Sequence, residues 1–321
     1  MQSTDGNFYG TTLSGGLSTN CPGGCGTVFK ISLAGSLTTL YSFTGINDGW
    51  GGAPVVQGSD GNFYGTTQVG GIYSNGAIYR VSSTGIFTNL YSFTGGTDGA
   101  APFAGLVQGS DGSFYGTTFA GGLTNYPPFG CGTVFKISQS GSLATLWSFD
   151  GGTDGANPAA VLLQGSDGNF YGTTQSGGAK GQGTIFQIGP AISLTNIYSF
   201  AGGTNGAGPV TGLMQGNDGN FYGTMYNGGT NYLGSLFKLV LPLNQLPNQI
   251  TAAQILGSNL IFNVSSIAGA TYRLQLSTDL AAGIWSNVPG VSVTNSVGGV
   301  LTVTNFTRPN LPTFYRFAIT P

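Results

Sequence analysis

Asp-Gly-Asn-Phe-Tyr-Gly-Thr-Thr, at residues 60–67, is the stretch that decides the fold of this chain. It recurs with small changes, so that five copies begin at residues 5, 60, 111, 167 and 218, spaced 55, 51, 56 and 51 residues apart. A period of this size, built from short apolar runs and glycine turns, is typical of arrays whose units stack on their neighbours. The repeat predicts an architecture and does not name a ligand or a reaction.

Each repeat is predicted to form four strands, as residues 104–149 illustrate. A short apolar run at 104–109 is followed by an Asp-Gly turn and a second run at 114–118. A third run at 132–138 and a fourth at 143–149 are again joined by a turn that contains glycine. Four antiparallel strands in about 50 residues, apolar on both faces, are typical of a propeller blade. A β-solenoid is the alternative, although its coils are usually much shorter.

The composition favours an all-β protein with few charges. Only 6% of the 321 residues are charged, whereas roughly a quarter are charged in an average protein, and 59 residues are glycine. His and Glu are absent, so the Glu–Lys pairs that stabilise exposed helices cannot form. With a net charge of −2 and no apolar run near the roughly 20 residues that span a bilayer, we expect no nucleic-acid partner, no membrane insertion and a monomer.

The predicted strands do not occur in equal numbers. The second and third strands recur five times, whereas the first and the fourth recur four times each. We therefore predict a β-propeller domain at residues 1–240 with about five four-stranded blades in an incomplete ring, preceded by further sequence. A proline-containing linker follows at 241–249, and alternating apolar runs at 250–321 predict a small β-sandwich.

Three motifs that recur in order carry a family resemblance. They are Leu-Tyr-Ser-Phe-Thr-Gly-Gly-Thr-Asp-Gly-Ala (90–100), Gln-Gly-Ser-Asp-Gly-Ser-Phe-Tyr-Gly-Thr-Thr (108–118) and Gly-Cys-Gly-Thr-Val-Phe-Lys-Ile (130–137). This pattern resembles the GloVer tandem repeat of secreted or surface proteins from Verrucomicrobia and related bacteria. The resemblance implies location and architecture, and it brings no catalytic residues. Residues 272–280 followed by Trp285 also resemble fibronectin-type-III-like modules.

The three cysteines predict one local disulfide. Cys21 and Cys25 flank Pro-Gly-Gly in a loop that lets their Cα atoms reach bridging distance. Cys131 occupies the same repeat position as Cys25, but Pro127 stands where its partner would be needed, so we expect a free thiol. A zinc site is the alternative and needs more ligands than this loop without His offers.

Eight of the ten Asp residues recur at two repeat positions, and we expect them to serve in turns. Calcium binding, which needs six to eight oxygens, is one alternative, and a lyase or hydrolase that uses Asp residues from different blades is another. We expect no metal or cofactor and no catalytic residue. The hairpin turns contain Asp5, Asp60, Asp111, Asp167 and Asp218, and the segments that cross between blades contain Asp48, Asp98 and Asp154, with Asn205 in the fourth.

A charged residue recurs on the third strand, where we expect it to pair with a turn Asp or to lie along a blade edge. The repeated Phe-Tyr pairs of the second strand are predicted to pack between blades. The charged position is occupied by Lys30, Arg80, Lys136 and Lys238, with Gln187 in the remaining copy.

Loops that differ between repeats form the candidate binding surface, because function on a rigid scaffold concentrates in its loops. In an antiparallel blade, loops between the second and third strands share a face with the crossing segments. Their aromatic and amide side chains suit a neutral glycan or peptide, although variable loops also carry such residues without function. The candidate ligand-binding residues are Trp50, Tyr73, Asn75, Asn125, Tyr126, Phe129, Asn231 and Tyr232.

Together these features predict a secreted or cell-surface repeat module. We expect it to bind an extracellular polysaccharide or a surface protein without catalysis. The competing hypothesis is a lyase or hydrolase that acts on an extracellular polymer. Two Asp side chains brought together across a cleft would favour the enzyme, whereas Asp residues confined to turns would favour the binding module.

Overall fold

The computed structural model of the chain contains two compact units, residues 1–215 with 222–238 and residues 216–221 with 239–321. Both consist of β-strands, and the one helical segment among the described residues is the single-turn 3-10 helix η1 (Gly203–Asn205). The structure describes residues 1–122, 130–165, 167–189, 192–216, 220–231 and 233–240, and then the strands of the C-terminal part.

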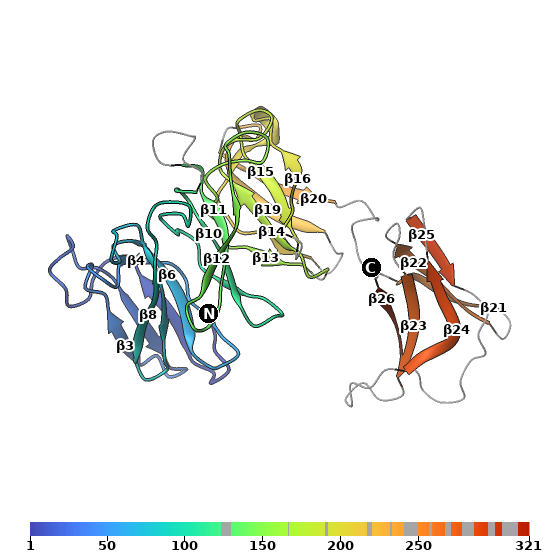
Figure 1. Ribbon diagram of the computed structural model, residues 1–321, viewed down its shortest axis with the longest axis horizontal. Coiled ribbons are helices and arrows are strands. Elements are labelled where there is room, and N and C mark those ends of the chain that lie inside the picture. Colours follow the sequence, from blue (N-terminus) through green and yellow to red (C-terminus); the bar gives the residue numbers. More distant parts are fainter. Residues whose placement is uncertain are drawn as a thin grey trace. The chain divides into compact units, whose positions relative to one another are not determined.

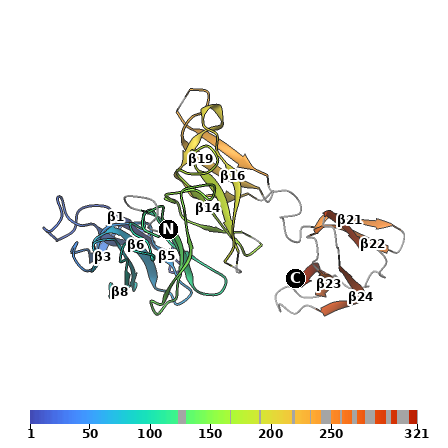
Figure 2. The same cartoon turned by 45° about the horizontal axis from the view of Figure 1, so that its top comes forward.

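In the first unit each repeat forms its own antiparallel sheet, which we call a blade and number 1 to 5 along the chain (Figures 1 and 2). Blades 2, 3 and 4 contain the four strands predicted for a repeat, so the all-β fold of four-stranded blades is confirmed, and no described sheet closes on itself. Blade 1 contains β1 (Phe8–Thr12), β2 (Thr27–Ile31) and β3 (Leu37–Ser42), and blade 2 contains β4 (Trp50–Gly52), β5 (Val56–Gln57), β6 (Phe63–Val69), β7 (Ala77–Val81) and β8 (Phe87–Ser92).

The other three blades continue the series. Blade 3 contains β9 (Val107–Gln108), β10 (Phe114–Thr118), β11 (Thr133–Ile137) and β12 (Leu143–Ser148). Blade 4 contains β13 (Leu163–Gln164), β14 (Phe170–Thr174), β15 (Thr184–Ile188) and β16 (Leu194–Ser199), and blade 5 contains β17 (Ala207–Pro209), β18 (Met214–Gln215), β19 (Phe221–Asn227) and β20 (Ser235–Leu239).

In the first four repeats the Asp-Gly turn is closed by its own carboxylate. Asp60 accepts hydrogen bonds from the backbone N–H of Asn62 at 3.1 Å, the Asn62 side chain at 2.7 Å and the Tyr64 hydroxyl at 2.8 Å. Burial of Asp60 opposes ionisation, but the hydrogen bonds from Asn62 and Tyr64 outweigh it and hold the pKa of this carboxyl below its usual range. The turn therefore fixes Tyr64, the second residue of the following strand β6. The same hydroxyl bond joins Tyr9 to Asp5, Tyr115 to Asp111 and Tyr171 to Asp167.

The Phe-Tyr pairs link blades 1 to 4 in series. Tyr64 stacks on Phe114 with the ring centroids 4.0 Å apart, and both side chains are fully buried. Because neighbouring side chains of a strand point to opposite faces, Phe faces the preceding blade and Tyr the following one. Stacked and edge-to-face ring pairs add to the burial of apolar surface, and the predicted packing role is confirmed. The other stacks are Tyr9 on Phe63 and Tyr115 on Phe170, at 3.8 and 4.0 Å.

A glutamine amide bridges successive blades beside these rings. The side-chain oxygen of Gln108 accepts the Ser59 backbone N–H at 2.9 Å, and its Nε2 donates to the Ser59 hydroxyl at 3.1 Å and to the Gly112 carbonyl at 3.0 Å. Gln164 repeats these bonds with Ser110 and Gly168. The amide thus connects the turn of one blade to the turn of the next without using charge.

The stack is interrupted at blade 1, where Phe8 is 43% exposed and no described tyrosine stacks on it. In blades 2 and 3 the equivalent Phe63 and Phe114 are completely buried. Blade 1 also has only an isolated bridge between Gln2 and Phe8 in place of a first strand. The two ring environments provide a matched comparison of the same residue in the same repeat position.

Replacing Phe114 by Ala should destabilise the first unit by about 3–5 kcal/mol, because it removes a buried ring and leaves a cavity between two blades. The same change at Phe8 should cost under about 1 kcal/mol, since part of the ring is already in water. Urea unfolding followed by near-ultraviolet circular dichroism measures both free energies of unfolding. Equal losses would contradict the role given to the inter-blade stack.

The second unit contains two three-stranded antiparallel sheets, with the orders β21-β22-β25 and β24-β23-β26. Leu274 on β23 is completely buried. Two sheets of this kind are what the predicted β-sandwich requires, while the fibronectin-type-III-like resemblance stays a prediction and Trp285 lies outside the described residues. The strands are β21 (Ile250–Leu256), β22 (Asn259–Ser266), β23 (Thr271–Ser277), β24 (Ser286–Thr294), β25 (Gly299–Val303) and β26 (Phe314–Thr320).

Candidate functional site

The loop between the second and third strands of a blade is hydrogen-bonded to the crossing segment that leaves the same blade. One residue per loop accepts, through its carbonyl, a backbone N–H of that segment. We call the place of this residue in the repeat the latch position. The pairs are Cys25 with Gly51 (3.4 Å), Asn75 with Ala101 (2.8 Å), Cys131 with Asn157 (2.8 Å) and Gln182 with Gly208 (3.0 Å).

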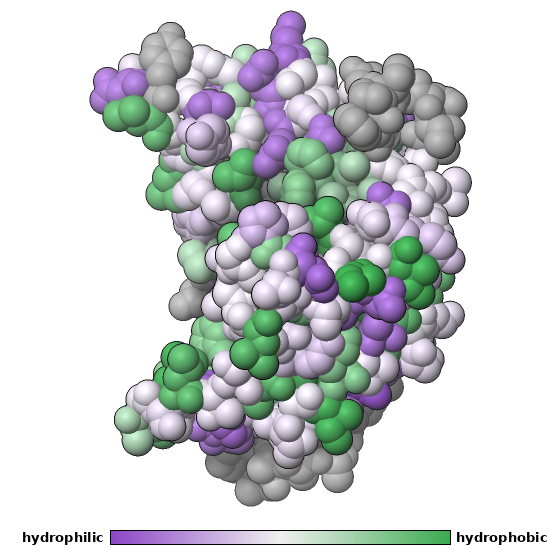
Figure 3. Space-filling model, turned by 90° about the vertical axis from the view of Figure 1, so that its left-hand side faces the viewer, coloured by the Kyte–Doolittle hydropathy of each residue, from purple (hydrophilic) through white to green (hydrophobic). Residues whose placement is uncertain are grey.

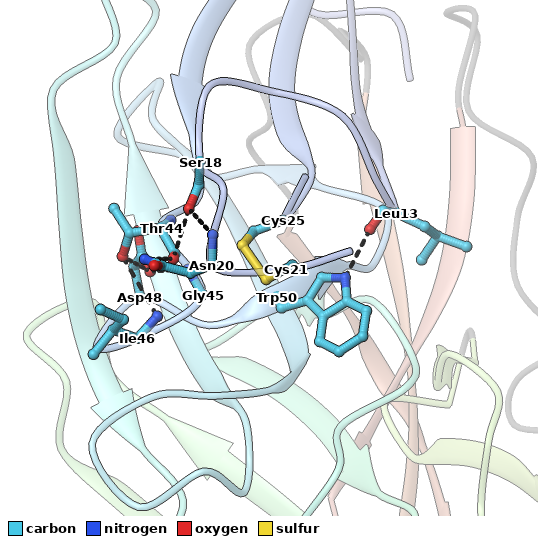
Figure 4. Close-up of a disulfide and its surroundings, with 10 residues drawn as sticks. All are labelled: Leu13, Ser18, Asn20, Cys21, Cys25, Thr44, Gly45, Ile46, Asp48 and Trp50. Atoms are coloured by element: carbon cyan, nitrogen blue, oxygen red, sulfur yellow. Dashed lines mark hydrogen bonds between the residues drawn. A yellow bond between two sulfur atoms is a disulfide. The ribbon is translucent and has the colours of Figure 1, made fainter. Parts of the chain in front are cut away.

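In blade 1 the latch is reinforced by a disulfide between Cys21 and Cys25 (Figure 4). The bridge lies against Gly45, where a Cβ atom would come within 2.5 and 2.6 Å of the two sulfurs. The Ser18 hydroxyl and the Asn20 amide also donate to the Thr44 carbonyl, at 3.0 and 2.9 Å. The loop is thereby fixed to the crossing segment, and the free thiol in the chain is the buried Cys131.

The crossing segment is itself held by a buried carboxylate. Asp48 accepts the Tyr41 hydroxyl at 2.8 Å, the Thr44 backbone N–H at 2.8 Å, the Thr44 hydroxyl at 2.6 Å and the Gly45 N–H at 3.1 Å. Asp98 receives the same bonds from Tyr91 and Thr94 in blade 2. Both oxygens of each carboxylate are therefore used within the turn, as expected for a structural Asp.

Trp50 lies in this crossing segment, where the other repeats have Ala100, Ala156 and Ala207. Its indole N–H donates to the Leu13 carbonyl at 3.2 Å, and 37% of the side chain is exposed (Figure 4). The hydrogen bond restricts the orientation of a ring that still meets solvent.

Two exposed aliphatic residues are neighbours of Trp50, one through its backbone carbonyl and one across a strand pair. Leu13, which is 60% exposed, carries the carbonyl that binds the indole, and Val69, which is 42% exposed, lies opposite Trp50 where β4 pairs with β6. Directly opposite residues of an antiparallel pair have neighbouring side chains on one face. We call these three residues the Trp50 patch. The equivalent pairs in later blades are small or polar: Ala100 with Ala120, Ala156 with Ser176, and Ala207 with Asn227.

The remaining predicted ligand-binding residues have mixed surroundings. Tyr73 is exposed. Asn75 is the latch residue of blade 2, and its side chain donates to the Tyr73 carbonyl at 3.0 Å. Asn231 is exposed, whereas Asn125, Tyr126, Phe129 and Tyr232 lie outside the described residues.

The structure brings Trp50 together with Leu13 and Val69, which sequence reasoning did not single out. The signal that could have found them is the comparison of equivalent positions across repeats. Trp50 opposite Val69 is the large apolar pair in that series.

In blades 1 and 3 the recurring cation pairs with a turn Asp as predicted, whereas Arg80 of blade 2 donates to the Thr88 hydroxyl. Lys136 Nζ lies 2.7 Å from the Asp111 carboxylate, and Lys30 Nζ lies 3.3 Å from that of Asp5. Burial opposes ionisation of Asp111, but the hydrogen bonds from Lys136 and Tyr115 outweigh it and lower the pKa of this carboxyl. These carboxylates are ionised and engaged within their own blade.

Asp150 and Asp154 form a carboxyl pair in the crossing segment after blade 3. Asp154 accepts the Trp147 indole N–H at 3.0 Å and the Asp150 backbone N–H at 3.2 Å. Burial, followed by the neighbouring Asp150, raises the pKa of Asp154 to about 6, while hydrogen bonds from Asp154 and the Gly152 N–H lower the pKa of Asp150. Both groups belong to one turn. Within the described part of the chain, no cluster of three His, Cys, Asp or Glu side chains could hold a metal.

Replacing Asp154 by Asn should flatten the dependence of stability on pH between about 4 and 6. The pKa of Asp154 in the folded state lies above the usual 3.8, so protonation of Asp154 stabilises the folded wild type. This stabilisation is present in full below pH 3.8 and is lost as the pH rises through about 6. For a half-exposed carboxyl we expect a change of about 1 kcal/mol.

Urea unfolding of both proteins from pH 4 to 7 measures the effect, and Asn205 shows that an amide fits this repeat position. If the free energies of unfolding of the two proteins differ by the same amount at every pH in this range, the raised pKa assigned to Asp154 is contradicted.

Removing the disulfide by replacing Cys21 and Cys25 with Ser should destabilise the loop at 13–25. A bridge that closes so short a loop contributes about 2 kcal/mol in the chain-entropy account. Limited proteolysis should cut the variant within this loop while sparing the wild type. A Cys131→Ala variant should keep the loop protected, and peptide mapping without reductant should recover the Cys21–Cys25 link. Equal protection in the double variant would contradict the clamping role.

The fold and the site define a protein built of β-blades in series, with exposed side chains on loops that the crossing segments hold in place. The chain belongs to the Gloeobacter/Verrucomicrobia repeat family, whose profile matches residues 1–158 and 107–253 and confirms the resemblance. A comparison with curated proteins finds no match. In the part that the structure describes, no helix has the length and hydrophobicity to cross a membrane.

Solved structures with similar strand arrangements have low identity. A putative 6-phosphogluconolactonase from Bacteroides uniformis is 14% identical, with a TM-score of 0.41 over 92% of this chain and 99% of that one. An α-L-arabinofuranosidase from Clostridium thermocellum is 16% identical, with a TM-score of 0.36 over 70% of this chain and 79% of that one. The extracellular domain of a putative hybrid two-component system from Bacteroides thetaiotaomicron is 12% identical, with a TM-score of 0.41 over 75% of this chain and 30% of that one. These likenesses carry no argument about activity.

Proposed function

We propose that this protein is a non-catalytic module that binds a neutral extracellular polysaccharide through the Trp50 patch. The observation that carries the proposal is the partly exposed Trp50 ring, which is held by a hydrogen bond to the Leu13 carbonyl and lies opposite Val69. An aromatic ring fixed before binding loses little conformational entropy when a ligand packs on it. The C–H faces of a sugar ring are apolar and match such a surface.

The electrostatics of the surface favour a neutral ligand. Charged residues make up 6% of the chain, and the face in Figure 3 is mostly pale, with scattered green and purple areas. Neither long-range attraction of an anion nor counterion release is available to such a protein. Hydroxyl-rich neutral polymers remain, because they can be recognised by stacking and by short hydrogen bonds.

Non-catalytic binding is supported by the use of the carboxylates. Asp48, Asp98 and Asp60 accept hydrogen bonds inside their own turns. The one observation that favours a hydrolase is the raised pKa of Asp154, which would suit a general acid. Activity on a polysaccharide that disappears in Asp154→Asn would establish that second candidate.

An extracellular or cell-surface location belongs to the same proposal. The Cys21–Cys25 disulfide is the kind of bond that forms and persists in oxidising compartments. A surface protein is the alternative partner, and it would appear in the binding test as retention on intact cells without retention on purified polysaccharide.

The proposal is tested with Trp50→Ala in affinity electrophoresis on cellulose derivatives, xylan, mixed-linkage glucan and mannan. We expect the wild type to be retarded by at least one polymer and the variant to bind about tenfold more weakly, since aromatic anchors carry much of an interface's energy. Stability should change little, because Ala is native at this position in blades 3 and 4.

Leu17→Ala is the control. Leu17 is on the 13–25 loop with Leu13 and is strongly exposed, but it is not part of the Trp50 patch. No binding by the wild type, or equal binding by Trp50→Ala, would overturn the proposal.

A further inference from the structure

A pocket of about 370 Å³ lies between blades 3 and 4, away from the Trp50 patch in sequence and in blade. Its polar lining residues include the Asp111–Lys136 ion pair and Gln164. Its apolar lining residues include Leu146, Phe170 and Ile192. Clefts of roughly 300–1,000 Å³ are the usual size of small-molecule sites.

The pocket arises where the repeat is broken. In blades 2 and 3 the turn before the fourth strand has Gly85 and Gly141, and a Cβ atom there would lie 2.6 Å from the Leu40 carbonyl oxygen and 2.7 Å from that of Leu90. The equivalent residue in blade 4 is Ile192. Its side chain does not fit at the spacing of the other interfaces, so blade 4 cannot approach Leu146 on β12 in the same way.

A second difference from the other repeats, at Ala144, enlarges the same pocket. Ala144 on β12 lines the pocket and lies opposite Lys136 of β11. In the other blades the equivalent residue is threonine, opposite Lys30, Arg80 and Gln187. The smaller side chain removes two non-hydrogen atoms from the pocket wall. Two independent departures from the repeat, Ile192 and Ala144, therefore both enlarge the space between blades 3 and 4.

Ile192 also has an unfavourable backbone conformation, with φ at 57°. A β-branched residue with positive φ is a genuine outlier, and such strain is concentrated at functional sites. Glycine would relieve the strain, and the chain uses it in blades 2 and 3.

We propose that this pocket binds an uncharged aromatic molecule of one or two rings that carries a hydroxyl group. The charges of Lys136 and Asp111, 2.7 Å apart, balance each other, which favours a neutral ligand over either ion. Asp111 already accepts the Tyr115 hydroxyl at 2.8 Å, whereas the ammonium group retains further N–H donors for a ligand oxygen. The ring then packs against Leu146, Phe170 and Ile192.

Sugars are poor candidates for the same pocket. Their hydroxyl groups would lose water against Leu146 and Ile192 without gaining hydrogen bonds, which is unfavourable. The pocket and the Trp50 patch thus select different chemistry, and the two proposals can fail independently.

The test titrates the full chain with 2-naphthol by isothermal calorimetry, with 2-naphthoate and glucose as competitors. The wild type should bind 2-naphthol, bind the carboxylate about tenfold more weakly and not respond to glucose. The double variant Ile192→Gly/Ala144→Thr restores the residues of the other repeats, so its affinity should fall about tenfold while its melting temperature stays equal or rises. Thr88→Ala makes the reverse substitution at the equivalent position of blade 2, where the neighbouring turn keeps Gly141, and the affinity for 2-naphthol should not change.

A second measurement does not depend on the variants folding. Nuclear Overhauser effects between 2-naphthol and the methyl groups of Leu146 and Ile192 are expected in the wild type. Absence of binding, undiminished affinity in the double variant, preference for 2-naphthoate or glucose, or contacts only elsewhere on the protein would each overturn the proposal.

Discussion

The stack of each repeat's tyrosine on the next repeat's phenylalanine is the interaction on which the structure depends. Tyr64 can reach Phe114 in one orientation because Asp60 accepts its hydroxyl, and Gln108 fixes the turns of both blades beside the rings. A chain with so few charges cannot rely on ion pairs for this purpose. Aromatic burial and neutral hydrogen bonds replace them, and the Asp residues serve as acceptors inside turns.

Features that recur in every repeat were predictable from the sequence. The Phe-Tyr pairs, the Asp-Gly turns and the pairing of Lys136 with Asp111 follow from local spacing, because each blade presents the same residues to its neighbours. The Trp50 patch was only half predictable. Trp50 is visible as an aromatic residue without equivalents, but its contact with Leu13 and Val69 depends on a hydrogen bond and a strand register that no local pattern encodes.

Asn75 shows the opposite limitation. As a polar residue in a variable loop it resembles a ligand-binding side chain, yet it shares the latch position with Cys25, Cys131 and Gln182. The common feature of these four residues is a backbone carbonyl that accepts a crossing-segment N–H, which places no demand on the side chain. Sequence variation at that position therefore reflects structural freedom, and only the backbone contact identifies it.

Departures from the repeat are informative because the fold supplies an internal reference for each of them. At the position of Trp50 the other blades fold with alanine, as Ala100 and Ala156 show. At the position of Ile192, blades 2 and 3 fold with glycine, namely Gly85 and Gly141. Each blade contacts only its neighbours, so a change at one interface leaves distant interfaces intact. A large exposed ring in blade 2 and a strained isoleucine in blade 4 can then be retained separately. The scaffold does without either side chain in its other blades, and this is the physical ground for proposing that both serve recognition.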